Sequence, residues 1–346
     1  MPITPYISDI LAQPTTLRDS IDQFDPSRTE ELIARIKKGD FNKIVLTGMG
    51  SSHYAAYPAW LTMLSLTTPT ISVNSAELLH YGREMIDGRT LLWINSQSGF
   101  SVEIVRLLEL LKNRRPAFQL SMTNNSDSPV AQSADLVFPI HAGSEATVST
   151  KTFTNMMATL MLVSAQLAGK DWKTLIISMQ KAIDGMENYL AYWPKKVMEL
   201  DALLGNIDQL LILGRGASMG AVWQGSLISK EAGKAAFEGM SVADFRHGPM
   251  ELASPRLTLL IMQGAAKTSR LNHALAMEVV GCGGKVLWIG DQPNPHLPTL
   301  LIPEVEENVR PLVEILPLQM LTILMAQRNG LEPGKFRNIT KVTTEE

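Results

Sequence analysis

Residues 91–101 read LLWINSQSGFS and join an apolar run to a turn that is rich in hydroxyl groups. The helical pattern of residues 102–111 begins directly after this turn. A continuous apolar run is typical of a buried parallel strand, and the first turn of a following helix points unpaired backbone N–H groups at the loop. The stretch therefore predicts a strand, a tight turn and a helix N-terminus that can bind an anion.

Serine and glycine side chains give this turn its chemistry. Ser96, Ser98 and Ser101 offer hydroxyl donors, and Gly99 lets the backbone approach a ligand closely. The turn has no lysine that would make it a Walker-type nucleotide loop, so a sugar phosphate fits better than ATP. An ordinary serine-glycine turn that caps a helix is the alternative interpretation.

Two further segments can face the same pocket. Residues 43–53 read KIVLTGMGSSH and repeat the pattern of strand, turn and helix start. An apolar strand at residues 136–140 precedes a hydroxyl-rich segment at residues 142–154, whose composition suits a polyol. Ligands of open α/β sheets lie outside the carboxyl ends of the strands, so these turns can converge. His53 could reach the pocket or pack at the start of its helix.

A weak internal repeat divides the chain. Residues 45–52 are echoed by residues 211–218, and residues 91–94 by residues 257–262. Each half continues with a helix and two more strands, at residues 118–122 and 136–140 in one half and at residues 285–289 and 300–303 in the other. We therefore predict an α/β protein with two doubly wound parallel-sheet units of flavodoxin-like type in tandem.

The repeat also predicts how the chain is organised. Residues 156–192 carry helix formers at helical spacing and are expected to connect the two units. The predicted ranges are an N-terminal helical segment (1–40), a first domain with the phosphate loops and the connecting helices (41–190), a second domain (191–335) and a C-terminal tail (336–346).

Composition limits the possible classes of protein. With 346 residues, of which 45% are hydrophobic, the chain can bury two cores of ordinary size. Its single cysteine, Cys282, excludes a disulfide framework and a cysteine-rich metal site, and it suits a reducing compartment, so we predict a cytoplasmic protein. The net charge of −3 gives no footprint for nucleic acid. No apolar run of about 18 residues predicts a membrane span, and the N-terminus lacks the pattern of a signal peptide.

Four motifs occur along the chain: G-x-G-S-S at residues 48–52, SQSG at 96–99, S-T-K-x-F-T at 149–154 and R-H-G-P at 246–249. Their order and sequence resemble the sugar isomerase (SIS) domains in the isomerase half of glutamine:fructose-6-phosphate amidotransferases, from about residue 42 to residue 346. The resemblance implies a sugar 6-phosphate substrate, no metal or other cofactor, and a homodimer with shared active sites. It places the substrate on Gly50, Ser51, Ser52, Ser96, Gln97, Ser98, Ser101 and Ser149.

The resemblance also implies three catalytic residues. Glu231 aligns with the base that moves a proton between C1 and C2 of the sugar, and His247 aligns with a ring-opening histidine that the neighbouring subunit contributes. Lys341 matches a lysine in a tail that closes over the sugar, where it attacks the open-chain carbonyl as a Schiff-base nucleophile. Without the resemblance, a surface glutamate beside Lys230, a histidine that caps a turn and a solvated tail lysine are the alternatives.

Several positions depart from the family pattern. Only some forty residues precede the first predicted domain, so we expect no glutaminase domain and no transfer of ammonia from glutamine. Ile228 stands where the amidotransferase has a catalytic lysine, so the proton relay must differ. Phe100 replaces a glutamate after SQSG and could shape the pocket for another substituent. Residues 263–266, QGAA, offer almost no hydroxyls, so we expect one sugar site per chain, in the first half.

Three functions fit these observations. The first is an enzyme that acts on an amino-sugar or fructosamine 6-phosphate, as an isomerising deaminase or deglycase. The second is a simple phosphosugar aldose-ketose isomerase that uses the same residues. The third is a non-catalytic phosphosugar sensor, which we rank last because residues 1–40 are too short for a helix-turn-helix domain and a linker. The expected lack of a glutaminase half favours release of an amine over its installation.

Overall fold

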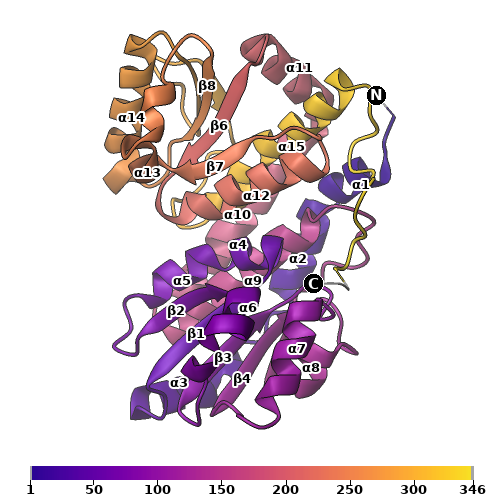
Figure 1. The fold of residues 1–346 in the computed structure, drawn as a ribbon, viewed down its shortest axis with the longest axis vertical. Coiled ribbons are helices and arrows are strands. Elements are labelled where there is room, and N and C mark those ends of the chain that lie inside the picture. Colours follow the sequence, from indigo (N-terminus) through magenta and orange to yellow (C-terminus); the bar gives the residue numbers. More distant parts are fainter. Residues whose placement is uncertain (1, 344–346) are drawn as a thin grey trace. The chain divides into compact units, whose positions relative to one another are not determined.

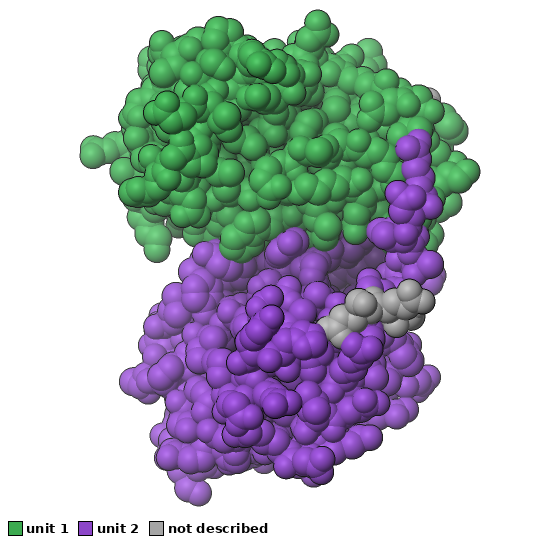
Figure 2. Space-filling view, in the orientation of Figure 1, with its two compact units in different colours: residues 1–14, 146–148, 177–336 green, residues 15–145, 149–176, 337–346 purple. Residues whose placement is uncertain are grey.

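The computed structural model describes residues 2–343, and the chain divides into two compact units (Figure 2). Unit 1 takes residues 1–14, 146–148 and 177–336, whereas unit 2 takes residues 15–145, 149–176 and 337–346. Helix α10 (Trp172–Ala191) runs from unit 2 into unit 1. The N-terminal residues thus belong with the second sheet, and the C-terminal tail belongs with the first.

Unit 2 contains a wholly parallel sheet (Figure 1). Its strands are β1 (Lys43–Gly48), β2 (Thr70–Asn74), β3 (Thr90–Asn95), β4 (Phe118–Thr123) and β5 (Leu136–Pro139), in the order β2-β1-β3-β4-β5. This is the flavodoxin-like order, in which the direction of winding reverses between β1 and β3.

Helices cover both faces of this sheet. On one face, α7 (Val102–Leu111) packs on apolar side chains of β1 and β3, including Val45, Leu92 and Ile94. Elsewhere in unit 2, α9 (Lys151–Leu167) packs on α4 (Gly50–Ala55) and α5 (Tyr57–Met63). Every residue of α9 is buried, so this helix forms part of the core. Unit 2 also contains α3 (Glu30–Lys38), α6 (Ser75–Glu77) and α8 (Pro129–Ser133), and α2 (Gln13–Asp22) leads into the unit.

Unit 1 repeats the same topology. Its strands are β6 (Gln209–Gly214), β7 (Glu238–Ser241), β8 (Leu257–Met262), β9 (Lys285–Gly290) and β10 (Thr299–Leu301), all parallel and in the order β10-β9-β8-β6-β7. Its helices are α1 (Pro5–Leu11), α11 (Trp193–Leu204), α12 (Met219–Glu231), α13 (Val242–Arg246), α14 (Ala266–Gly281) and α15 (Pro311–Arg328). The predicted fold of two doubly wound parallel units is therefore confirmed.

Some details of the sequence interpretation were wrong. Each sheet has five strands, whereas the sequence predicted four in each half, because β2 and β7 were missed. Both are edge strands, and neither has the continuous apolar run of a central strand; all five residues of β2 are only half-buried. The predicted connecting segment consists of the helices α9 and α10, and α9 begins at Lys151, within the hydroxyl-rich segment of residues 142–154. No helix within residues 2–343 is both long and apolar enough to cross a bilayer.

The turn between β3 and α7 requires glycine. Gly99 has a φ of +71°, and a Cβ atom there would lie 2.1 Å from the hydroxyl oxygen of Ser128, the residue that caps α8. Gly39, at the end of α3, has a similar φ of +79°, but a Cβ there would meet nothing within 4 Å. Both glycines have a left-handed backbone, but only at position 99 would a side chain also overlap another residue.

We expect Gly99→Ala to lower the free energy of unfolding more than Gly39→Ala does. Left-handed strain alone should cost about 1 to 2 kcal/mol in both variants, and only the alanine at position 99 must also displace Ser128. Urea unfolding of the two variants and the wild type measures the difference. An equal loss in both would show that Ser128 moves aside without cost.

A buried carboxyl group in unit 1 makes stability depend on pH. Glu314, in α15, has no exposed surface and accepts a hydrogen bond from the hydroxyl of Ser218 at 2.9 Å. Burial raises the pKa of Glu314 to about 7, although the bond from Ser218 and the nearby charge of Arg310 act in the opposite direction. Between its ordinary pKa of 4.5 and about 7, the unfolded chain has lost this proton and the folded chain still holds it.

We therefore expect the wild type to lose stability as the pH rises through this window, and Glu314→Gln to lack that loss. Relative to the wild type, the variant should gain on the order of 1 to 3 kcal/mol between about pH 4 and about pH 8. Denaturant unfolding at a series of pH values measures the gain. A difference between the two proteins that is the same at every pH would contradict it.

Candidate functional site

The loops predicted to bind phosphate follow the two strands at the reversal point of the unit 2 sheet. Gly48, the last residue of β1, is paired with Asn95, the last residue of β3. A Cβ atom on Gly48 would lie 2.8 Å from the carbonyl oxygen of Asn95, so glycine permits this close approach. The crevice at such a reversal point is where open α/β sheets bind their ligands.

Serine hydroxyls fasten these two loops. The hydroxyl oxygen of Ser52, in α4, accepts a hydrogen bond from the backbone N–H of Gln97 at 3.3 Å, which joins the first glycine loop to the SQSG turn. Ser96 accepts from the N–H of Gly99, and Ser98 accepts from the N–H of Phe100, each at 3.1 Å. A hydroxyl that accepts one hydrogen bond still has its own proton to donate to a ligand.

The remaining predicted binding residues lie at helix starts. Gly50, with a φ of +47°, and Ser51 open α4. Ser101 caps α7, and its carbonyl accepts from the N–H groups of Ile104 and Val105 at 3.0 Å. Ser149 precedes α9 and shares a hydrogen bond with the hydroxyl of Thr152 at 2.9 Å. The structure thus places all eight predicted binding residues in unit 2, either in the turn after β3 or at helix N-termini.

A cavity of about 690 Å³ opens beside the SQSG turn. Its walls come from this turn, from the loops after β4 and β5, and from the C-terminal tail, which contributes Lys341 and Val342. Part of the wall is apolar, and Phe100 there is 43% exposed. His141, with a φ of +48°, also lines the cavity, and burial lowers its pKa. The cavity therefore combines hydroxyl, amide, imidazole and amine groups with an apolar surface.

The C-terminal tail is fastened at two points. The amine of Lys341 lies 3.0 Å from a carboxylate oxygen of Glu145, and the backbone N–H of Val102 donates to the carbonyl of Thr343 at 3.2 Å. Val102 is the first residue of α7, so the tail takes one of the donors at that helix N-terminus. The sequence interpretation missed Glu145, whose available signal was an acidic residue shortly before the start of a helix.

The other two predicted catalytic residues lie in unit 1. Glu231 is the last residue of α12 and is half-buried, and its backbone carbonyl accepts from the amine of Lys234. His247 follows α13 and is exposed. Ile228, at the position of the family lysine, is completely buried. His53 is half-buried in α4, where burial lowers its pKa, and its Nδ1 atom is buried without a hydrogen-bond partner among the described residues.

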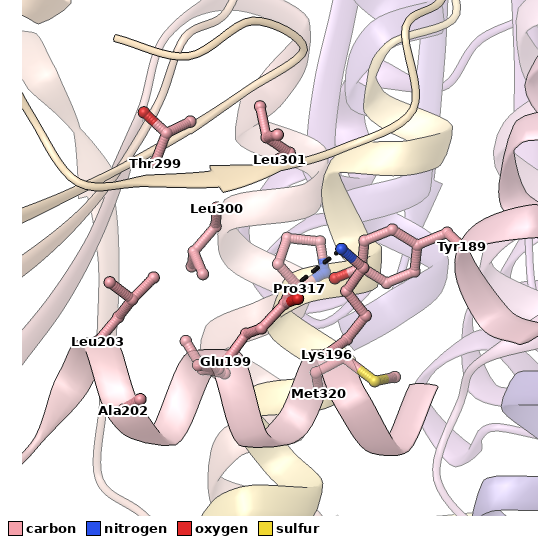
Figure 3. Close-up of a pocket in the computed structure, with 11 residues that line it drawn as sticks. Tyr189, Lys196, Glu199, Ala202, Leu203, Thr299, Leu300, Leu301, Pro317 and Met320 are labelled. Atoms are coloured by element: carbon pink, nitrogen blue, oxygen red, sulfur yellow. Dashed lines mark hydrogen bonds and ion pairs between the residues drawn. The ribbon is translucent and has the colours of Figure 1, made fainter. Parts of the chain in front are cut away.

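In unit 1, the turn after β8 at residues 263–266 corresponds to the SQSG turn of unit 2, and charged side chains hold it in place. Arg310 donates to the carbonyl of Gly264 and forms an ion pair with Asp291 at 2.6 Å. A separate cavity of about 450 Å³ lies between α11, α15 and β10, and its polar contact is the bond from Lys196 to Glu199 at 3.1 Å (Figure 3). None of the predicted site residues lines this cavity. Within residues 2–343, no group of three or more His, Cys, Asp or Glu residues could hold a metal ion.

Two curated proteins similar to this chain carry the same name. The chain is 26% identical over 350 residues to the glutamine–fructose-6-phosphate aminotransferase (isomerizing) of Pyrococcus horikoshii, which covers 98% of this chain and 57% of that protein. The enzyme of the same name from Thermococcus kodakarensis is 27% identical over 357 residues, with coverage of 98% and 58%. The chain thus spans little more than half the length of these relatives.

Solved structures share the fold at low identity. Tagatose-6-phosphate ketose/aldose isomerase from Escherichia coli has a TM-score of 0.82 at 20% identity and covers 97% of both chains. The C-terminal domain of glucosamine-fructose-6-phosphate aminotransferase from Francisella tularensis has a TM-score of 0.81 at 20% identity, with coverage of 96% and 98%. Glucosamine-6-phosphate deaminase from Thermotoga maritima has a TM-score of 0.71 at 19% identity, with coverage of 98% and 99%.

The family model of the SIS domain matches residues 40–165. This range holds all five strands of unit 2, the G-x-G-S-S loop, the SQSG turn and the start of α9. The predicted resemblance to SIS domains is therefore confirmed over residues 40–165 of this chain.

Proposed function

We propose that this chain is an enzyme that binds a sugar 6-phosphate in unit 2 and acts on its open-chain form, with an amino-sugar or fructosamine 6-phosphate as substrate. The observation that carries the proposal is that a single cavity is lined by Gln97 and Ser98 of the SQSG turn and by Lys341 of the tail. Hydrogen-bond donors for an anion and an amine thus lie at one cavity. An enzyme that binds phosphate and reacts with a carbonyl or imine requires both.

The phosphate is held by the loops at the reversal point of the sheet. Ser52, Ser96 and Ser98 are each oriented by a backbone N–H and keep a proton to donate. The start of α7 adds the positive end of a helix dipole. Gly50, Ser51, Gln97, Ser101 and Ser149 complete the proposed binding set.

Glu231 is the proposed base and His247 the proposed ring-opening residue. With a 2-amino sugar, the C2 proton moves to C1 and a proton passes from the amine nitrogen to O1, which leaves an alcohol at C1 and an imine at C2. The neutral amine of Lys341 adds to C2 as ammonia leaves, and water then releases the ketose and returns the lysine. The apolar wall at Phe100 leaves room for a carbon substituent on the amine, which favours fructosamine 6-phosphates as further substrates.

We expect the purified protein to release an amine from glucosamine 6-phosphate or from a fructosamine 6-phosphate. Lys341→Met should reduce release at least a hundredfold because the nucleophile is lost, whereas Lys335→Met, which removes an exposed lysine nearby, should not. Borohydride should trap the substrate on Lys341, as peptide mass spectrometry would show. Coupled assays with fructose 6-phosphate complete the panel.

The outcomes of this panel separate the three functions. Release of amine supports the proposal. Interconversion of ketose and aldose without release would replace it with the simple isomerase. Binding without turnover of any compound would replace it with the sensor.

The proposal includes a homodimer in which His247 serves the partner's site and Glu231 serves its own. Dimers with twofold symmetry are the commonest closed assembly, and His247 is exposed. Each mixed dimer of His247→Ala and Glu231→Gln would then have one intact site. We expect an equal mixture, after reversible dissociation, to recover about a quarter of wild-type activity.

Each inactive variant incubated alone is the control for this experiment, and native mass spectrometry verifies that mixed dimers form. Mixed dimers without activity would mean that the two residues do not serve opposite chains.

A further inference from the structure

We propose that Glu145 is the positioning residue of this site: it anchors the C-terminal tail and holds the amine of Lys341 at the cavity of unit 2. The inference deepens the proposed function and rests on it, because it gives the reacting lysine a fixed location. Glu145 lies outside the four motifs from which the site was predicted.

Glu145 is buried, and both of its carboxylate oxygens accept hydrogen bonds. Its side chain is 1% exposed, whereas that of Lys341 is 26% exposed. One carboxylate oxygen accepts from the N–H of Thr150 at 2.8 Å, from its hydroxyl at 3.1 Å and from the N–H of Thr152 at 3.2 Å. The other oxygen accepts from the hydroxyl of Thr152 at 2.7 Å and from the amine of Lys341 at 3.0 Å.

The two carboxylate oxygens of Glu145 have different roles. Three donors at the start of α9 fix the first oxygen, and α9 is a rigid support because all its 17 residues are buried. The positive end of the α9 dipole also faces the carboxylate. With the first oxygen fixed, the direction of the second is set, and that oxygen binds Lys341.

The tail needs such an anchor. Residues 337–343 form neither helix nor strand, so no regular backbone pairing holds them. A polar terminal segment of this kind frays unless it is tied down. The ion pair to Glu145 and the bond from Val102 to Thr343 tie it at two points, on either side of Val342 in the cavity wall.

The hydrogen bonds of Glu145 support a positioning role. All five partners of Glu145 donate, which is the pattern that an ionised carboxylate requires. Lys341, paired with it as an ammonium, has no lone pair. The amine must therefore give up a proton before it reacts, and Glu145 keeps the tail in place.

Hydrogen exchange of the C-terminal peptide tests the anchor without any substrate. We expect tail amides to exchange at least tenfold faster in Glu145→Gln and in Lys341→Met than in the wild type. Asp291→Asn is the matched control, because it breaks the ion pair with Arg310, also largely buried, in unit 1. It should leave tail exchange unchanged. Lys341→Met keeps the cap of α9, so it decides the question even if Glu145→Gln does not fold.

The double variant separates the anchor from the cap. If Glu145 acts through Lys341, Glu145→Gln adds no further tail exchange in the Lys341→Met background. Wild-type exchange in Lys341→Met would overturn the inference, and so would an equal increase from Glu145→Gln in both backgrounds.

The yield of the borohydride adduct on Lys341 gives a second readout. Glu145→Gln should lower the yield of the borohydride adduct on Lys341 at least tenfold and leave the dissociation constant for inorganic phosphate within twofold. An unchanged adduct yield overturns the positioning role. If the wild type itself forms no adduct on Lys341, the proposed function fails, and tail exchange alone still decides whether Glu145 anchors the tail.

Discussion

Parallel pairing is the constraint on which the rest of this structure depends. Each strand must be followed by a crossover before the next can pair with the same direction, so all strands of a sheet end at one edge. In the order β2-β1-β3-β4-β5, the helices after β1 and β3 leave on opposite faces. Their loops leave the sheet at the register pair of Gly48 and Asn95, and the hydroxyl of Ser52 joins the first loop to the SQSG turn there.

Unit 1 has the same topology with other side chains at its strand ends. It has the same strand order, yet the turn after β8 has a carbonyl bound by Arg310, which is itself paired with Asp291. Close by, Glu314 is completely buried against Ser218. The scaffold supplies the crevice, and the side chains at the strand ends decide whether a ligand or the protein's own charges occupy it.

The parts of this protein that sequence could predict are those with local causes. Central strands such as β3 are continuous apolar runs, and the SQSG turn carries its hydroxyls and its glycine within a few residues. The edge strand β2 lacks such a run because it has one neighbour and is only half-buried. The start of α9 was not predicted because its hydroxyl groups indicate a polar segment. In the structure, the hydroxyl of Thr154 donates to the carbonyl of Lys151 inside a buried helix. Glu145 was hidden because its partner Lys341 is 196 residues away.

Losing Lys341 and losing Glu145 would have different effects on stability. If Lys341 moves away, the carboxylate keeps four donors from Thr150 and Thr152, so its burial remains compensated. If Glu145 is lost, buried N–H groups at the start of α9 lose their acceptor, and an unsatisfied buried donor costs about 1 to 3 kcal/mol. Loss of the Lys341 contact would therefore leave the start of α9 intact, whereas loss of Glu145 would disturb both the tail and α9. The support of the tail and the support of α9 are thus separable contacts of the same carboxylate.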